Sequence, residues 1–189
     1  MNPDILNEIA AEVKRIAQAI APHRQKLGFG LRPKQIRQVY CTLKHGGVWH
    51  FMDEANNPIV IEHEALTGYV RELEFKAAID QGEKVFYLNC TLEADELYVV
   101  ESESTAHFSK ALLSAIAKLT SSELHQPLTI VPQVISLVEE VLTCQVYQGD
   151  RLVYAPYDQT TDWKGVSREA VNAVKLANAE GLSQATSSV

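Results

Sequence analysis

The hydrophobic residues of this chain repeat with two different periods, and each period predicts one type of element. A spacing of three and four residues is the one-sided stripe of an amphipathic helix. Stripes of this kind occur at residues 3–21, 108–119 and 163–177. Each of the three segments is therefore predicted to form a helix that packs one face against something apolar.

Between these helices, apolar and polar positions alternate or form short apolar runs, which is typical of β-strands. Strands are predicted at residues 35–44, 48–52, 59–61, 85–92, 97–100, 128–131, 141–147 and 151–155. The pair Gly46-Gly47 separates the first two runs, and two glycines between alternating runs favour a hairpin.

A long strand that begins at Leu66 changes the parity of its apolar residues part-way along. Leu66 and Val70 occupy even positions, whereas Leu73 and Phe75 occupy odd ones. Because side chains of a strand alternate between its two faces, the pattern requires one extra residue near Arg71 or Glu72. A long strand with a glycine and a bulge is expected to bend and to pair with strands of two sheets.

Residues 65–155 give the order bulged strand, strand, strand, helix, strand, strand. The segments in question are LTGYVRELEF, KVFYLNCTLEADELYVV, HFSKALLSAIAKL, LTIV and VLTCQVY. This order resembles the OB-fold, a five-stranded Greek-key barrel. The resemblance implies a mixed α+β chain: an OB-like barrel at 65–155, an N-terminal helix and basic β-hairpin extension at 1–64, and a C-terminal amphipathic helix and tail at 156–189. A split sheet with helices packed on one face is the alternative.

OB-folds commonly bind single-stranded nucleic acid, with bases stacked on aromatic rings and cations along the phosphates. The resemblance therefore implies a binding face on the first three barrel strands and their flanks, supplemented by the basic stretch before them. The candidate residues are Lys34, Arg37, Lys44, Tyr69, Arg71, Lys76, Lys84, Tyr87, Asn89 and Tyr98. The alternative is that Tyr87 and Tyr98 form a cross-strand packing pair covered by the N-terminal hairpin.

The net charge of −7 argues against a generic polyanion binder, but the charge is unevenly distributed. Residues 65–157 hold 6 Lys and Arg against 13 Asp and Glu, whereas residues 13–52 hold 8 basic residues and no acidic one. Aromatic residues Phe29, Tyr40 and Trp49 lie within the basic stretch. Such a stretch can bind nucleic acid, or it can dock on an acidic surface of its own chain or of a neighbour.

The N-terminus has no basic segment followed by an apolar one, and apolar runs are only a few residues long, so neither a signal peptide nor a membrane span is expected. Three scattered cysteines fit no closed disulfide set, which favours reduced thiols and a cytoplasmic protein. Cys41, His45 and His50 lie close in sequence, with His63 farther away, but their spacing matches no familiar zinc pattern. We expect neither a metal nor a cofactor.

The sequence contains no G-x-G-x-x-G, G-x-x-x-x-G-K-[ST], G-x-S-x-G or H-E-x-x-H motif. His107 and the paired carboxylates have no companion residues that would identify a catalytic site. The leading hypothesis is a non-enzymatic protein that binds single-stranded DNA or RNA, as a homo-oligomer because its terminal helices expose apolar stripes. The alternatives are a protein-interaction module with an acidic barrel and a small enzyme of unknown class.

Overall fold

The computed structural model describes residues 35–80, 82–139 and 141–186, and residues Lys34–Val189 form one compact unit. The predicted N-terminal helix at 3–21 lies outside the described residues. The elements are β1 (Ile36–Cys41), β2 (Trp49–Met52), β3 (Pro58–Val60), β4 (Leu66–Asp80), β5 (Glu83–Glu93), β6 (Leu97–Glu103), α2 (His107–Lys118), the 3₁₀ turn η1 (Glu123–His125), β7 (Leu128–Ser136), β8 (Val141–Gln148), β9 (Arg151–Leu152) and α3 (Trp163–Thr186).

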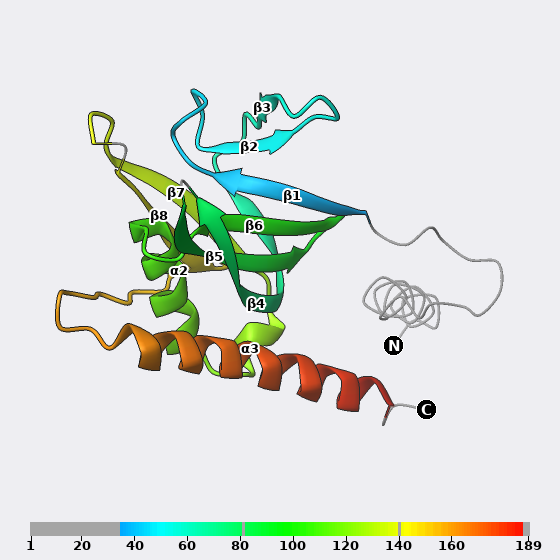
Figure 1. The fold of residues 1–189 in the computed structure, drawn as a ribbon. Coiled ribbons are helices and arrows are strands. Elements are labelled where there is room, and N and C mark those ends of the chain that lie inside the picture. The colour runs from blue at the N-terminus through cyan, green and yellow to red at the C-terminus, as the bar shows by residue number, and fades with distance from the viewer. Residues whose placement is uncertain (1–34, 81, 140, 187–189) are drawn as a thin grey trace, which may run out of the picture. The chain divides into compact units, whose positions relative to one another are not determined.

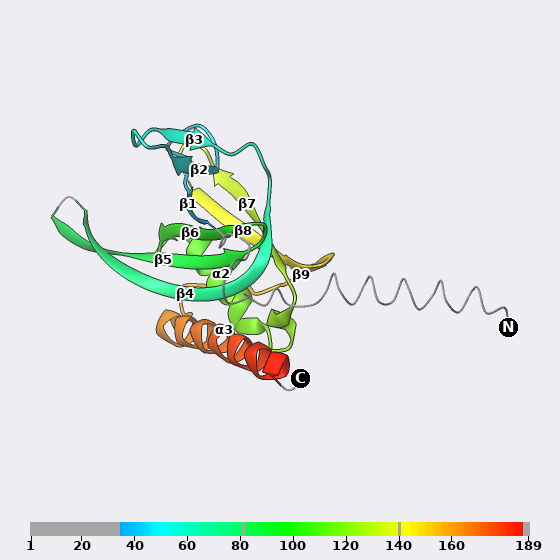
Figure 2. The ribbon, with the colours of Figure 1, turned by 90° about the vertical axis from the view of Figure 1, so that its right-hand side faces the viewer.

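The strands of the described chain form a nine-stranded sheet in the order β3-β2-β1-β6-β5-β4-β7-β8-β9 (Figures 1 and 2). Neighbouring strands are antiparallel except for β1 and β6, which run parallel from the pair Ile36–Leu97 to the pair Tyr40–Glu101. The predicted hairpin about Gly46-Gly47 is confirmed, because β1 and β2 pair antiparallel. Its first strand adds to the edge of β6 and extends the sheet.

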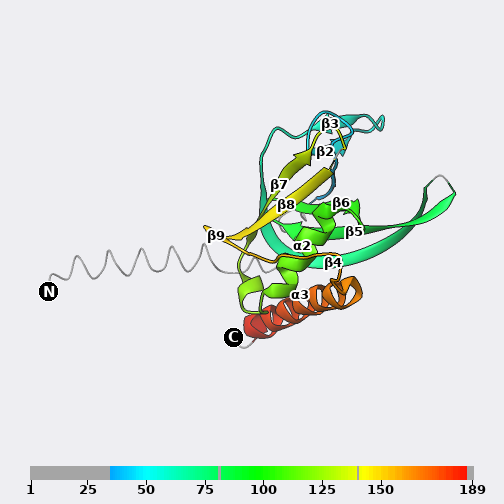
Figure 3. The ribbon, with the colours of Figure 1, turned by 90° about the vertical axis from the view of Figure 1, so that its left-hand side faces the viewer.

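The predicted bulge is confirmed: the register of β4 against β5 shifts between Val70 and Glu72. Before the bulge, Leu66–Gly68 pairs with β7, and from Tyr69 onward the strand pairs with β5. Figures 2 and 3 show β4 curving through this point and then continuing with β5 as a projecting hairpin. One strand thus links two differently oriented parts of the sheet.

Three hydrogen bonds between Asn178 of α3 and β4 hold the bend in β4. The side-chain amide of Asn178 donates to the main-chain carbonyl of Arg71 at 3.0 Å and to that of Val70 at 3.4 Å. The Arg71 guanidinium donates in turn to Asn178 Oδ1 at 3.2 Å. The C-terminal helix therefore supplies a donor to main-chain carbonyls at the bulge, where the strand ladder is locally disrupted.

The expected closed five-stranded barrel is wrong. The strands β6-β5-β4-β7-β8 lie in the order that the barrel requires, but closing it would need β6 to pair with β8. The free edge of β6 is taken by β1, and β8 pairs on its outer side with β9. The result is an open mixed sheet, which the N-terminal strands extend.

The core lies where α2 and α3 cover the sheet. Leu88, Cys90 and Leu92 of β5 are almost fully buried, as are Leu112 and Ile116 of α2. The stripe of α3 is buried as well, through Ala170, Val174 and Ala177. Because the chain itself covers this stripe, α3 gives no support for a homo-oligomer. The homo-oligomer stays a prediction that rests on the apolar stripe at residues 3–21 alone.

The β4–β5 hairpin extends beyond its neighbours as an arm (residues 74–86). Pairing of β5 with β6 begins only at Tyr87 and Glu103, and pairing of β4 with β7 ends at Gly68. Within the described chain both edges of the arm are open beyond Phe86, whose main-chain carbonyl accepts a hydrogen bond from Ser104 N at 2.8 Å. Phe75, Ile79 and Phe86 on one of its faces are between 38% and 73% exposed.

We predict that Gly68→Ala destabilises the chain by about 1–3 kcal/mol, because overpacking against a fixed backbone is costly. A Cβ at this position would lie 3.0 Å from the Glu93 carbonyl oxygen and 3.3 Å from Leu92 Cβ. Urea unfolding measures the change. The control is Gly181→Ala in α3, where a Cβ meets nothing within 4 Å; it should raise stability by up to about 1 kcal/mol. Equal effects of both substitutions would contradict the close approach.

Candidate binding pocket

A cavity of about 370 Å³ lies where the parallel strands β1 and β6 both end. Its wall continues into the loop after β1, the first residues of α2 and the start of β8. Cys41, Phe108 and Leu142 form an apolar part of the lining. Adjacent parallel strands deliver their carboxyl-terminal residues to the same edge, and such edges are favoured positions for ligands in open sheets.

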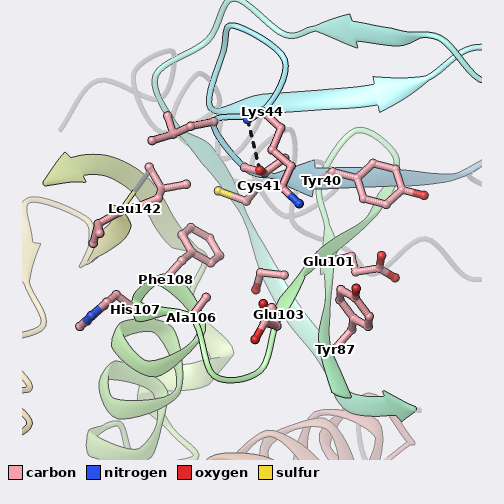
Figure 4. Close-up of a pocket in the computed structure, with 14 residues that line it drawn as sticks. Tyr40, Cys41, Lys44, Tyr87, Glu101, Glu103, Ala106, His107, Phe108 and Leu142 are labelled. Atoms are coloured by element: carbon pink, nitrogen blue, oxygen red, sulfur yellow. Dashed lines mark hydrogen bonds between the residues drawn. The ribbon is translucent and has the colours of Figure 1, made fainter. Parts of the chain in front are cut away.

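The polar part of the lining comes from the sheet face opposite the core. Strand register places Tyr40 of β1 opposite Glu101 of β6, and Glu101 opposite Asn89 of β5. Tyr87 lies two residues from Asn89 on the same strand face, opposite Glu103. Figure 4 shows the Glu101 carboxylate between the Tyr40 and Tyr87 rings. Two phenol rings thus flank one carboxylate at the pocket.

The Glu101 carboxylate is only partly solvated. Gln38 Nε2 donates to its Oε2 at 3.2 Å. Burial raises the pKa of Glu101 above its ordinary value, and nearby Lys76 opposes that rise. Burial and the charge of Glu101 together raise the pKa of the Tyr40 hydroxyl. These shifts indicate that the carboxylate has less compensation from neighbouring groups than it would have in water.

Two buried polar atoms, one on β5 opposite Glu101 and one on β2 opposite Tyr40, have no hydrogen-bond partner in the described chain. Asn89 is 3% exposed, and its Oδ1 is unpaired. His50 is 1% exposed, and its Nδ1 is unpaired, although its ring stacks on Tyr40 with centroids 5.3 Å apart. Burial, followed by the effect of His45, lowers the pKa of His50. Unpaired buried groups are costly, so their occurrence beside a cavity suggests a ligand that would satisfy them.

The start of α2 forms another part of the wall. Its N-cap is Ala106, which offers no side-chain acceptor, and the first turn has no acidic residue. Ser109 donates to the Glu103 carbonyl at 2.7 Å and shares a hydrogen bond of 2.6 Å with Ser102. His107 shares a hydrogen bond of 3.1 Å with the Tyr157 hydroxyl. The Ser109 contacts hold the helix start against the end of β6, and the His107 contact joins it to the segment between β9 and α3.

Four of the residues predicted from the sequence lie in or beside this pocket. Tyr87 and Lys44 line it, Asn89 borders it, and Lys76 is the cross-strand neighbour of Tyr87 on β4. Lys76 is exposed and lies 3.4 Å from the Glu74 carboxylate. Part of the predicted face is therefore present, but carboxylates lie among its rings and cations.

Tyr98 was expected on this face and is not there. It lies opposite Leu92, whereas Tyr87 lies opposite Glu103, so the two tyrosines point to different faces and form no cross-strand pair. Tyr98 packs against the core, and burial and a hydrogen bond to Asp95 raise its pKa. The sequence does not reveal which register the strands adopt, and a shift of one residue reverses every face.

The other predicted cations are dispersed. Arg37 pairs with Glu96 at 2.9 Å, and Arg71 lies over the Tyr69 ring while pairing with Glu93 at 2.6 Å. Lys84 lies over the Phe86 ring on the projecting arm. Lys34 lies outside the described residues.

The cysteines and histidines considered for zinc do not converge. Cys41 is opposite Trp49 and Tyr40 is opposite His50, so Cys41 and His50 face opposite sides of the hairpin. No group of three metal-binding side chains occurs among the described residues. Cys41, Cys90 and Cys144 are free and buried, and burial raises the pKa of all three thiols, that of Cys90 to about 12.

Sequence reasoning missed Gln38 and Glu101 as site residues and treated Tyr40 only as part of a basic stretch. Their proximity depends on the parallel pairing of β1 with β6, whose partners are about 60 residues apart in the chain. The alternation of Gln38 and Tyr40 with buried Val39 and Cys41 was the available signal. This alternation indicates that Gln38 and Tyr40 share one face of β1, but it does not indicate which strand pairs with β1.

Comparison with known proteins gives no assignment: no family model, curated protein or solved structure matches this chain. In the part of the chain that the structure describes, no helix combines the length and apolar character needed to span a membrane.

We predict that Glu101→Gln modestly stabilises the chain at pH 7, by no more than about 1 kcal/mol for this partly exposed group. The raised pKa means that the folded state binds the proton more tightly, so stability rises as pH falls through that pKa. The neutral amide should therefore be more stable at pH 7, and its advantage should shrink near pH 4.5. Thermal unfolding at both pH values measures this. Exposed Glu62→Gln controls for net charge; an equal gain there would contradict a local cause.

Proposed function

We propose that the chain is a non-enzymatic protein that binds single-stranded nucleic acid and holds a base in the pocket by stacking it on Tyr40 or Tyr87. The observation that carries this proposal is a cavity flanked by two phenol rings with unpaired hydrogen-bonding groups beside them. Aromatic side chains stack on bases of any sequence, and polar groups at the edge of such a site contact the base. The volume lies at the lower end of the roughly 300–1,000 Å³ typical of small-ligand pockets.

The phosphates need a separate source of positive charge. Residues 35–189 hold 11 Lys and Arg against 21 Asp and Glu. Arg37, Arg71 and Arg151 are engaged by Glu96, Glu93 and Glu123 at 2.6–2.9 Å. Residues 13–34 hold six basic residues and no acidic one. In this proposal the basic stretch contacts the phosphates, and the acidic remainder suppresses non-specific binding of polyanions.

A second candidate is recognition of a basic segment of another protein. It is favoured by Glu101 and Glu103 in the pocket, beside rings that can also stack on a guanidinium. The acidic body would attract such a partner, and the basic stretch would then have no role in binding. The two candidates differ in the ligand that binds and in the sign of the charge that it carries.

We predict that Tyr87→Ala weakens binding of a labelled single-stranded oligonucleotide about 5- to 100-fold, the range expected for loss of one stacked base. Fluorescence anisotropy at about 50 mM salt measures the affinity. Tyr154→Ala is the matched control, because this ring is 77% exposed and does not line the pocket. Absence of oligonucleotide binding together with binding of an arginine-rich peptide would reject the first candidate and support the second.

We also predict that Lys26→Gln, Arg32→Gln and Lys34→Gln together make oligonucleotide binding less dependent on salt. Each phosphate contact contributes a slope of about −0.7 to log K against log salt for single strands, so losing three contacts should flatten it by about 2. A triple variant at exposed Lys164, Arg168 and Lys175 of α3 carries the same charge change. If both triple variants alter the slope equally, the basic stretch has no special role.

A further inference from the structure

We propose that the pocket selects guanine over the other bases and that the Glu101 carboxylate recognises guanine by accepting its hydrogen bonds. This inference rests on the proposed function and adds a base specificity to it. It follows from the acceptor groups that the sheet leaves without donors, from their spacing, and from the donor pattern of each base.

The pocket has an excess of hydrogen-bond acceptors. An ionised carboxylate offers about four lone-pair positions, and in the described chain only Gln38 donates to Glu101. Asn89 Oδ1, on the neighbouring strand, is buried and accepts no hydrogen bond from the described residues. A ligand that satisfies these atoms must present hydrogen-bond donors to them, and on a nucleobase those donors are N–H groups.

These acceptors lie close together because β5 and β6 place them directly opposite each other. Cβ atoms of such a pair are about 4.5–5.5 Å apart. The Tyr40 and Tyr87 rings flank the same carboxylate (Figure 4). A planar ligand stacked on either ring would therefore present its edge to Glu101.

Guanine is the base whose edge best fits this arrangement. Its N1–H and N2 amino group are adjacent donors, and a carboxylate can accept both in the two-bond geometry that it forms with arginine. Adenine and cytosine place one amino donor beside a ring-nitrogen acceptor, and thymine and uracil place one N–H between two carbonyls. In these bases a ring nitrogen or carbonyl oxygen, which is itself an acceptor, would face the Glu101 carboxylate, and neither acceptor would have a donor. A mismatch of this kind discriminates strongly between ligands.

The test compares two ligands that differ by a single amino group. The full chain is titrated with oligothymidylate carrying one central guanine and with the same strand carrying hypoxanthine, which lacks the N2 amine. The guanine strand should bind about 10-fold or more tightly, the effect expected of one hydrogen bond to a charged group. Glu101→Gln should bring the two affinities within about 2-fold, and the exposed Glu62→Gln should preserve the difference.

The outcomes separate this inference from the proposed function. Equal binding of both strands by the unaltered chain would overturn guanine selection and leave nucleic-acid binding intact. Discrimination that persists in Glu101→Gln, in a variant that unfolds at the same temperature or higher, would overturn the role of Glu101. If no oligonucleotide binds, both proposals fail. If an arginine-rich peptide binds and no oligonucleotide does, the ligand that presents two adjacent N–H donors to Glu101 is a guanidinium group.

Discussion

The pairing of β1 with β6 is the interaction on which the rest of the pocket depends. Five consecutive residue pairs join strands that are far apart in the chain, and they run parallel in an otherwise antiparallel sheet. This pairing brings Tyr40 beside Glu101 and ends both strands at the cavity. The same pairing occupies the edge of β6 and prevents the sheet from closing on β8. The architecture and the binding site thus have one common origin.

The sequence predicted much of the local structure because local structure follows residue periodicity. The change of parity along β4 correctly required a bulge near Arg71, and Gly46-Gly47 correctly indicated a hairpin. The closed barrel was wrong because element order does not specify which distant edges meet. Tyr98 was placed on the wrong face because the register across the β5–β6 turn is set by packing of the whole sheet.

The pocket combines several features that reduce stability. A partly buried carboxylate on β6, an unpaired asparagine oxygen on β5 and an unpaired histidine nitrogen on β2 lie within one sheet. An apolar replacement of similar shape would remove these costs. Groups retained at such a cost are typical of binding sites, where the free energy is regained when a ligand arrives.

The projecting β4–β5 arm exposes main-chain groups that could pair with another strand, and its exposed Phe75, Ile79 and Phe86 would favour that association. Charged residues are distributed along the same arm, with Glu74 and Lys76 on β4 and Glu83 and Lys84 on β5. In edge-to-edge association of two arms, these charges would have to be desolvated or set against like charges. Charged residues on an exposed edge hairpin are among the features by which native proteins oppose edge-to-edge association.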